Sequence, residues 1–70
     1  MHRRRVSSTA VRSVGYDEDR HELEIEYAEG GVYRYSLVPR RVYEQLLAAD
    51  SIGRYVTRRV KPNYPVAQVE

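Results

Sequence analysis

Residues 21–37 of the chain read HELEIEYAEGGVYRYSL, and polar and apolar side chains alternate along most of this stretch. In its first half, Leu23, Ile25 and Tyr27 point to one face and glutamates to the other, which is the period-2 pattern of a half-buried strand. The pair Gly30-Gly31 tolerates the positive φ values that a tight turn needs. The stretch therefore predicts a β-hairpin.

In the second strand of this hairpin, Tyr33 and Tyr35 share a face with the apolar residues of the first. The opposite face carries Arg34 and three glutamates, Glu22, Glu24 and Glu26. Opposite charges on paired strands contribute about 0.2–1 kcal/mol per pair. Because this second face is charged, we expect it to meet water.

The segment before the hairpin, residues 10–17, also favours a strand, but Val11 is out of phase with Val14 and Tyr16. A β-bulge near Ser13 would bring the three to one face. After the hairpin, Pro39 suits the first turn of a helix.

The apolar period then changes to 3.6 from Arg40 to Ala49, and a second short helix is expected from Ile52 to Val60. The predicted fold is α+β, with a three-stranded antiparallel β-meander followed by two short helices packed on one face. We expect residues 1–6 to form a basic flexible arm, 7–66 a single domain and 67–70 a tail.

Composition narrows the possible classes of protein. The chain has 70 residues, no cysteine and 2 histidines, so disulfides, thiolate metal sites and a histidine metal cage are not expected. Its basic start lacks the apolar segment of a signal peptide, and there is no apolar run long enough to span a membrane. We expect a cytoplasmic protein without cofactor or metal and with no membrane partner.

The formal net charge of +2 hides a segregation along the chain. Residues 1–16 hold four arginines and no acid, residues 17–29 hold seven acids and one arginine, and residues 30–70 hold seven bases and three acids. Aromatic residues are also unusual, because 7 tyrosines occur without phenylalanine or tryptophan. A tyrosine ring can pack in a small core or stack on a base.

The helical half therefore contains the first candidate site, a basic face that could contact phosphates, with these residues: Arg40, Arg41, Arg54, Arg58, Arg59, Lys61 and Tyr64. Clustered cations bind phosphate backbones in a salt-dependent way. The alternative interpretation is a solvated helix face in a basic protein.

The motif Tyr33-Arg34-Tyr35 is a second candidate, because strand aromatics can stack unpaired bases. Its shared face with Leu23 favours core packing instead. Ser51 is expected to be an ordinary helix N-cap, and Gly53 to allow close approach of a neighbouring backbone, with Tyr55 bordering the apolar side. No nucleophile–base set or phosphate-binding glycine loop is present, so we expect neither an enzyme nor a small-molecule substrate.

In the order and spacing of these residues, the chain resembles the KTSC domain family, named for the C-terminus of some lysyl-tRNA synthetases and also found as free-standing bacterial proteins. The resemblance covers residues 7–66 and is carried by Val14-Gly15-Tyr16-Asp17, Leu23-Glu24-Ile25, Tyr33-Arg34-Tyr35, Val38-Pro39, Leu46-Leu47, Ser51, Gly53, Tyr55 and Tyr64-Pro65. It implies the fold and the domain boundary, and its synthetase setting implies RNA as a partner, although the family has no established function.

Two functions follow as hypotheses. The first is a small non-catalytic module that binds RNA, such as tRNA, through the basic helical face. The second is a protein-interaction or self-association module with no role in nucleic-acid binding.

Overall fold

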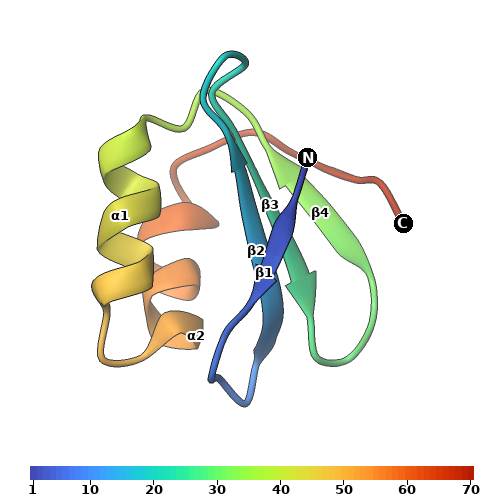
Figure 1. The fold of residues 1–70 in the computed structure, drawn as a ribbon, viewed down its shortest axis with the longest axis vertical. Coiled ribbons are helices and arrows are strands. Elements are labelled where there is room, and N and C mark those ends of the chain that lie inside the picture. Colours follow the sequence, from blue (N-terminus) through green and yellow to red (C-terminus); the bar gives the residue numbers. More distant parts are fainter.

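The computed structural model describes residues 1–70 and has α+β architecture (Figure 1). Five strands form one antiparallel sheet in the order β1-β2-β3-β4-β5. The elements are β1 (Arg3–Arg5), β2 (Val11–Asp17), β3 (Glu22–Tyr27), β4 (Val32–Tyr35), α1 (Arg40–Ala48), α2 (Ile52–Tyr55), the π-helical turn η1 (Val56–Val60) and β5 (Val66–Gln68).

The prediction of three strands was two short. Both additional strands come from segments expected to be irregular, since Arg3–Arg5 of the expected arm pairs with β2, and Val66–Gln68, largely in the expected tail, pairs with β4. Each has only three residues, too few for a pattern in the sequence. They are ordered as strands because the neighbouring strand supplies their hydrogen-bond partners.

The central hairpin has the predicted register. Ile25 lies opposite Tyr33, and Glu24 lies opposite Arg34. Its turn uses positive φ values at both glycines, 110° at Gly30 and 86° at Gly31. The conformation that glycine adopts most easily is therefore required at both turn positions.

Strand β2 contains the expected irregularity. The register against β3 shifts between Val11 and Ser13, which confirms the predicted bulge. As a result, Val11 and Val14 are both fully buried, although they are three residues apart in a strand.

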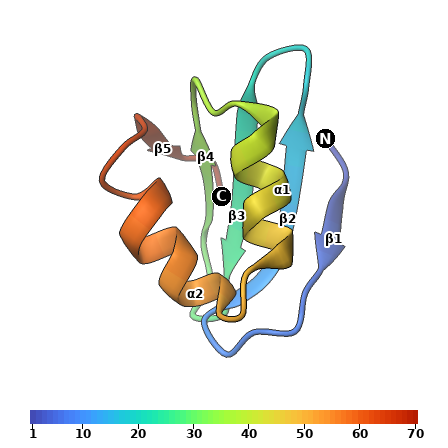
Figure 2. The same ribbon diagram turned by 90° about the vertical axis from the view of Figure 1, so that its left-hand side faces the viewer.

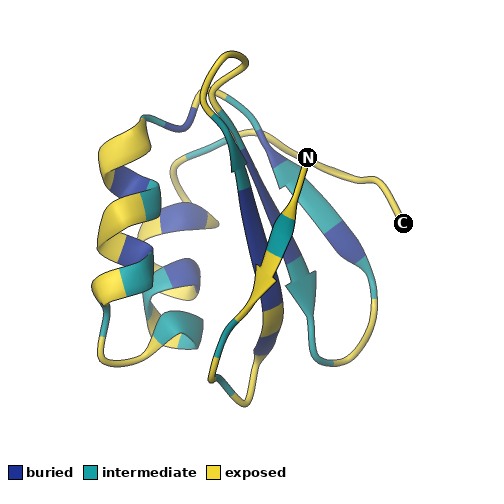
Figure 3. Ribbon diagram, in the orientation of Figure 1, coloured by how far each residue is buried: buried dark blue, intermediate teal, exposed yellow.

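The helices cover one face of the sheet. Figure 2 shows α1 and α2 in front of the strands, and in Figure 3 the helix surfaces turned toward the sheet are the buried ones. The core between the two layers consists of Val11, Val14, Leu23, Ile25, Tyr35, Val38, Val42, Leu46, Val56 and Val60. No helix has the length and apolar character needed to cross a membrane.

Strand β4 ends two residues earlier than its alternation predicts. Leu37 takes a positive φ of 64° and exposes 73% of its surface. The chain turns here toward α1, and the amide of Val38 donates to the carbonyl oxygen of His21 at 2.9 Å. The alternating pattern continued through Leu37, but the crossover to the helix layer interrupts the strand.

Candidate nucleic-acid interface

The second helix, formed by α2 and η1 together, carries the exposed arginines Arg54, Arg58 and Arg59. Ser51 caps its N-terminus, because the Ser51 hydroxyl accepts from the Arg54 amide at 3.2 Å. This confirms the predicted cap. Arg54 and Arg58 stand one turn apart on the outer side of the helix, and both are exposed.

Gly53 lets this helix lie close to the chain that precedes β2. A Cβ atom at Gly53 would be 3.0 Å from the Cβ of Ala10, a spacing tighter than ordinary van der Waals contact. Gly53 is therefore closely approached, as predicted, but by the Ala10 side chain and not by a neighbouring backbone.

The last turn of this helix is a π turn. The Lys61 amide donates to the carbonyl oxygen of Val56 at 2.9 Å, an i→i+5 bond instead of the i→i+4 bond of an α-helix. One extra residue in the turn rotates the following side chains by about 100° relative to a continuous α-helix. Lys61 is therefore turned away from Arg54 and Arg58, with which α-helical spacing had grouped it.

Four arginines lie around two adjoining hollows, and we call this region the arginine surface. One hollow of 280 Å³ includes Arg54, Arg58 and Arg59 in its lining. The other, of 210 Å³, includes Arg41 and Arg59. Since Tyr55 and Arg59 line both hollows, the surface is continuous from α1 to α2 and η1.

The arginine surface is not neutralised by acids. None of its four guanidinium groups takes part in an ion pair, and Asp50 is the one acid that lines either hollow. The charge of these side chains is therefore available to an anionic ligand.

Two tyrosines, Tyr55 and Tyr64, lie within the arginine surface. The Tyr55 hydroxyl donates to Gln45 Oε1 at 2.8 Å and so joins the second helix to α1. Burial raises the pKa of Tyr55, against the opposing effect of the nearby Arg59 and Arg41 charges. Tyr64 lines the second hollow beside Arg59 and is half-buried.

Arg40 stands apart from the other predicted contact residues. Its guanidinium binds Glu18 at 3.0 Å and Glu44 at 3.2 Å. Two carboxylates therefore neutralise the Arg40 charge, which we had expected to belong to the basic face.

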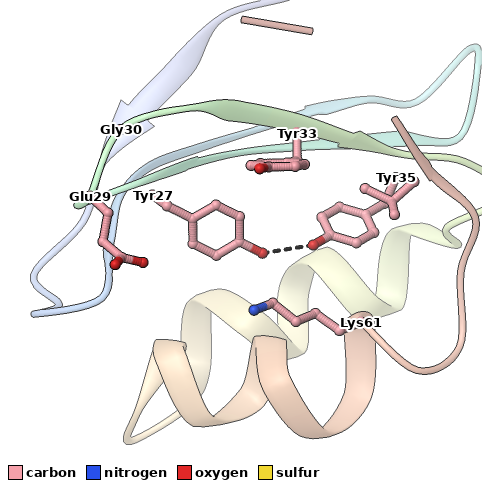
Figure 4. Close-up of a pocket in the computed structure, with 7 residues that line it drawn as sticks. Tyr27, Glu29, Gly30, Tyr33, Tyr35 and Lys61 are labelled. Carbon is pink, nitrogen blue, oxygen red and sulfur yellow. Dashed lines mark hydrogen bonds between the residues drawn. The ribbon is translucent and has the colours of Figure 1, made fainter. Parts of the chain in front are cut away.

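Lys61 lies at a separate site, which we call the tyrosine cleft. Its Nζ is 5.1 Å from the centroid of the Tyr27 ring. The cleft has a volume of 390 Å³ and is lined by Tyr27, Glu29, Gly30, Tyr33, Tyr35, Lys61 and Val66 (Figure 4). The Tyr27 and Tyr35 hydroxyls share a hydrogen bond of 2.7 Å.

The three residues of the motif Tyr33-Arg34-Tyr35 lie in three different environments. Tyr35 is 2% exposed and belongs to the core, as predicted for both tyrosines. Tyr33 is half-buried and lines the tyrosine cleft. Arg34 points to the opposite face of the sheet.

On that opposite face, the expectation of a water-exposed row of glutamates was wrong at its centre. Glu24 is only 3% exposed. Arg34 Nη2 donates to Glu24 Oε2 at 2.7 Å, and Arg3 from β1 donates to Oε1. Burial by itself would raise the pKa of Glu24, but the hydrogen bonds from Arg34 and Arg3 outweigh it and lower the pKa.

Sequence reasoning missed the tyrosine cleft and the role of Arg3. The cleft combines residues from β3, the hairpin turn, β4, the end of η1 and β5, which no local pattern joins. One signal was present, because Tyr27 and Tyr33 flank the Gly30-Gly31 turn on one face of the hairpin.

The comparisons with known proteins agree on one family. A profile of the KTSC domain matches residues 7–64. An uncharacterized protein of Stutzerimonas stutzeri is 42% identical over 64 residues, which are 91% of this chain and 90% of that protein. A protein of Tsukamurella paurometabola is 41% identical over 59 residues, 84% of this chain and 88% of its own length.

A solved structure supports the fold. The crystal structure of a KTSC domain protein from Yersinia pestis superposes with a TM-score of 0.95 at 35% identity, covering 99% of this chain and 97% of that one. Both edge strands lie within the matched length.

Proposed function

This chain belongs to the KTSC domain family, and we propose that it is a non-catalytic module that binds RNA through the arginine surface. The observation that carries the proposal is the set of four arginines, Arg41, Arg54, Arg58 and Arg59, around two adjoining hollows without an ion-pair partner. Arginine guanidinium groups suit phosphate because they present several donors in one plane.

The tyrosines within the surface favour an RNA with unpaired bases. Tyr55 and Tyr64 are half-buried, so each ring keeps part of its surface accessible beside the cations. Unpaired bases stack on such rings, whereas a duplex presents its phosphates and hides its base faces. Single-stranded regions of a folded RNA such as tRNA combine both requirements.

The buried tyrosines and Glu24 are not tuned for acid–base catalysis at neutral pH. Burial raises the pKa values of Tyr16, Tyr27 and Tyr35, and the arginine hydrogen bonds lower the pKa of Glu24. Each of these shifts moves the pKa of the group further from neutral pH. A general acid or base works best with a pKa near the working pH.

Filter binding of tRNA across a salt series tests the proposal. Arg58→Glu should weaken binding roughly tenfold or more at low salt, because it replaces a phosphate contact with a repulsion. The matched control is Arg20→Glu, which changes the net charge equally in the exposed turn between β2 and β3. Failure of the wild-type chain to bind at low salt, or equal losses in both variants, would refute the proposal.

The alternative is a protein-interaction or self-association module, and Leu37 is the feature that favours it. Its side chain is 73% exposed in a positive-φ conformation, which is costly for a large apolar residue. Sedimentation at several concentrations separates the two functions. A dimer that dissociates on Leu37→Ser and ignores tRNA would support the alternative.

A further inference from the structure

The tyrosine cleft is walled by aromatic rings that the helices leave partly uncovered. Tyr27 and Tyr33 meet edge to face, with centroids 5.4 Å apart and planes at 73°. In Figure 4 the Tyr33 ring is seen edge-on above Tyr27, and the Tyr27–Tyr35 hydroxyl pair lies between these strands and Lys61. The volume of the tyrosine cleft, 390 Å³, falls in the range of pockets that hold a small organic group.

The cleft offers unused hydrogen-bond donors beside its acceptors, which are the tyrosine hydroxyl oxygens and the Glu29 carboxylate. The Tyr27 and Tyr35 hydroxyls share one hydrogen bond, so one of their two protons remains free. Lys61 makes no ion pair or hydrogen bond, and its ammonium group carries three donors. Burial, followed by the hydrogen bond to Tyr35, raises the pKa of Tyr27 and keeps its hydroxyl protonated.

The unused donors can serve a planar ligand that has acceptor oxygens and a nearby negative charge. The rings offer a wall for a flat heterocycle, the free hydroxyl proton suits a carbonyl or ring nitrogen, and Lys61 suits a phosphate. Glu29 lies at the rim, where it is exposed and has no ion-pair partner. A nucleotide has all of the required groups.

The second helix connects the cleft with the arginine surface. Arg59 faces the hollow beside α1, Arg54 and Arg58 occupy the outer side, and the π turn directs Lys61 to the flank beside the sheet. An α-helix is about 10 Å across, so a strand that passes over it can reach both sites.

We infer that the tyrosine cleft receives one unpaired base of the RNA strand whose phosphates lie on the arginine surface, with Lys61 contacting the adjacent phosphate. This inference rests on the proposed function. It adds a base-binding subsite on a part of the molecule that the arginine surface does not include.

The test compares a short single-stranded RNA with a chain of the same length from which the bases have been removed. The wild-type protein should bind the RNA with bases about tenfold more tightly, as expected for stacking of a base on an aromatic ring. Tyr33→Leu should reduce this preference to the part that stacking on Tyr55 and Tyr64 supplies, whereas Tyr33→Phe should keep it in full. The matched control Tyr43→Phe alters a tyrosine that stacks on Tyr16, outside the cleft, and should keep it as well.

The outcomes separate the two proposals. If neither chain binds at low salt, the proposed function fails. If both bind equally to the wild-type protein, and Arg58→Glu weakens both, the arginine surface stands and the base subsite is refuted. A preference for bases that Tyr33→Leu leaves unchanged also refutes the subsite, because the stacking then occurs elsewhere, on Tyr55 or Tyr64.

A free mononucleotide distinguishes a strand site from a small-molecule site. Titrated into the labelled protein, it should shift the NMR signals of the Tyr27 and Tyr33 rings only at millimolar concentration, because it cannot reach the arginines. Saturation at micromolar concentration, unaffected by Arg58→Glu, would identify the cleft as an independent nucleotide site and overturn the inference.

Discussion

Gly15 determines whether the first strand can join the sheet. A Cβ atom at this position would lie 2.5 Å from the backbone oxygen of His2 and 3.1 Å from Cγ of Arg3. Gly15 pairs with Arg3 on one side and with Glu24 on the other. Its missing side chain therefore lets Arg3 extend across β2 to the Glu24 carboxylate.

Gly15→Ala should destabilise the protein by roughly 1–3 kcal/mol, because the added methyl group overpacks the contact with β1. Urea denaturation of the full chain measures this loss. In a chain that lacks residues 1–5 the same substitution should be nearly neutral, and an equal loss in both backgrounds would show that β1 is not the cause.

Glu24 makes stability depend on pH. Its pKa is lowered in the folded protein from the ordinary value of 4.5, so the unfolded chain binds a proton more readily. The stability that Glu24 contributes is fully present above that ordinary value and is lost as the pH falls through the lowered pKa of the folded state.

Glu24→Gln should cost roughly 1–3 kcal/mol at neutral pH, because charge-assisted hydrogen bonds are lost. It should also flatten the decline of stability below about pH 4.5. Urea denaturation at a series of pH values measures both effects. A variant as acid-sensitive as the wild-type protein would mean that another carboxylate is responsible.

At the scale of the elements, the second helix begins with an ordinary serine N-cap and ends in an unusual π turn. Ser51 caps its first turn, and Thr57 Oγ1 donates to the Gly53 carbonyl oxygen at 3.0 Å before the π turn. Such turns often occur at functional sites in proteins. Here the turn separates Lys61 from the arginines while Val56 and Val60 both remain buried.

Ser51→Ala should destabilise the protein by about 1 kcal/mol, the usual contribution of a serine N-cap. Thermal unfolding measures the change. Ser7→Ala is the matched control, since Ser7 is exposed and irregular in structure, and it should remain within about 0.5 kcal/mol of wild type. Equal effects would indicate that the cap contributes nothing specific.

At the scale of the whole molecule, acidic side chains of the sheet form ion pairs, whereas most basic side chains of the helical layer do not. The sheet neutralises its own acids, since Glu24 binds Arg3 and Arg34, and Glu26 lies 3.9 Å from Arg12. In the helical layer Arg40 is paired with Glu18 and Glu44, but the four arginines of the arginine surface have no ion-pair partner. The net charge of +2 therefore understates the positive field on the helical side.

This distribution predicts the salt dependence of RNA binding. If the four arginines each contact a phosphate of a single strand, the logarithm of the binding constant should fall with the logarithm of the salt concentration with a slope of about −3. Arg41→Ala should reduce the slope by about 0.7. Binding that does not change with salt would contradict a phosphate-directed surface.

Local patterns in the sequence were sufficient for the hairpin, the bulge near Ser13, the two helices and the Ser51 cap. Each depends on residues within a few positions of one another, so alternation, helical period and capping chemistry identify it, but not the early end of β4 or the π turn of η1. The cations Arg41, Arg54, Arg58 and Arg59 were also identified, because exposed charges need no partner to be recognised.

Tertiary structure alone decided the edge strands, the burial of Glu24, the contact of Arg40 with Glu18 and the position of Lys61. The edge strands are stable only because a neighbouring strand satisfies their backbone groups, and Glu24 is buried only because Arg3 returns across Gly15. Lys61 faces the tyrosine cleft because one extra residue enters the helical turn, where the packing of Val60 against the sheet overrides the local period. In each case the deciding contact joins residues far apart in the chain, and its energy exists only once the chain has folded.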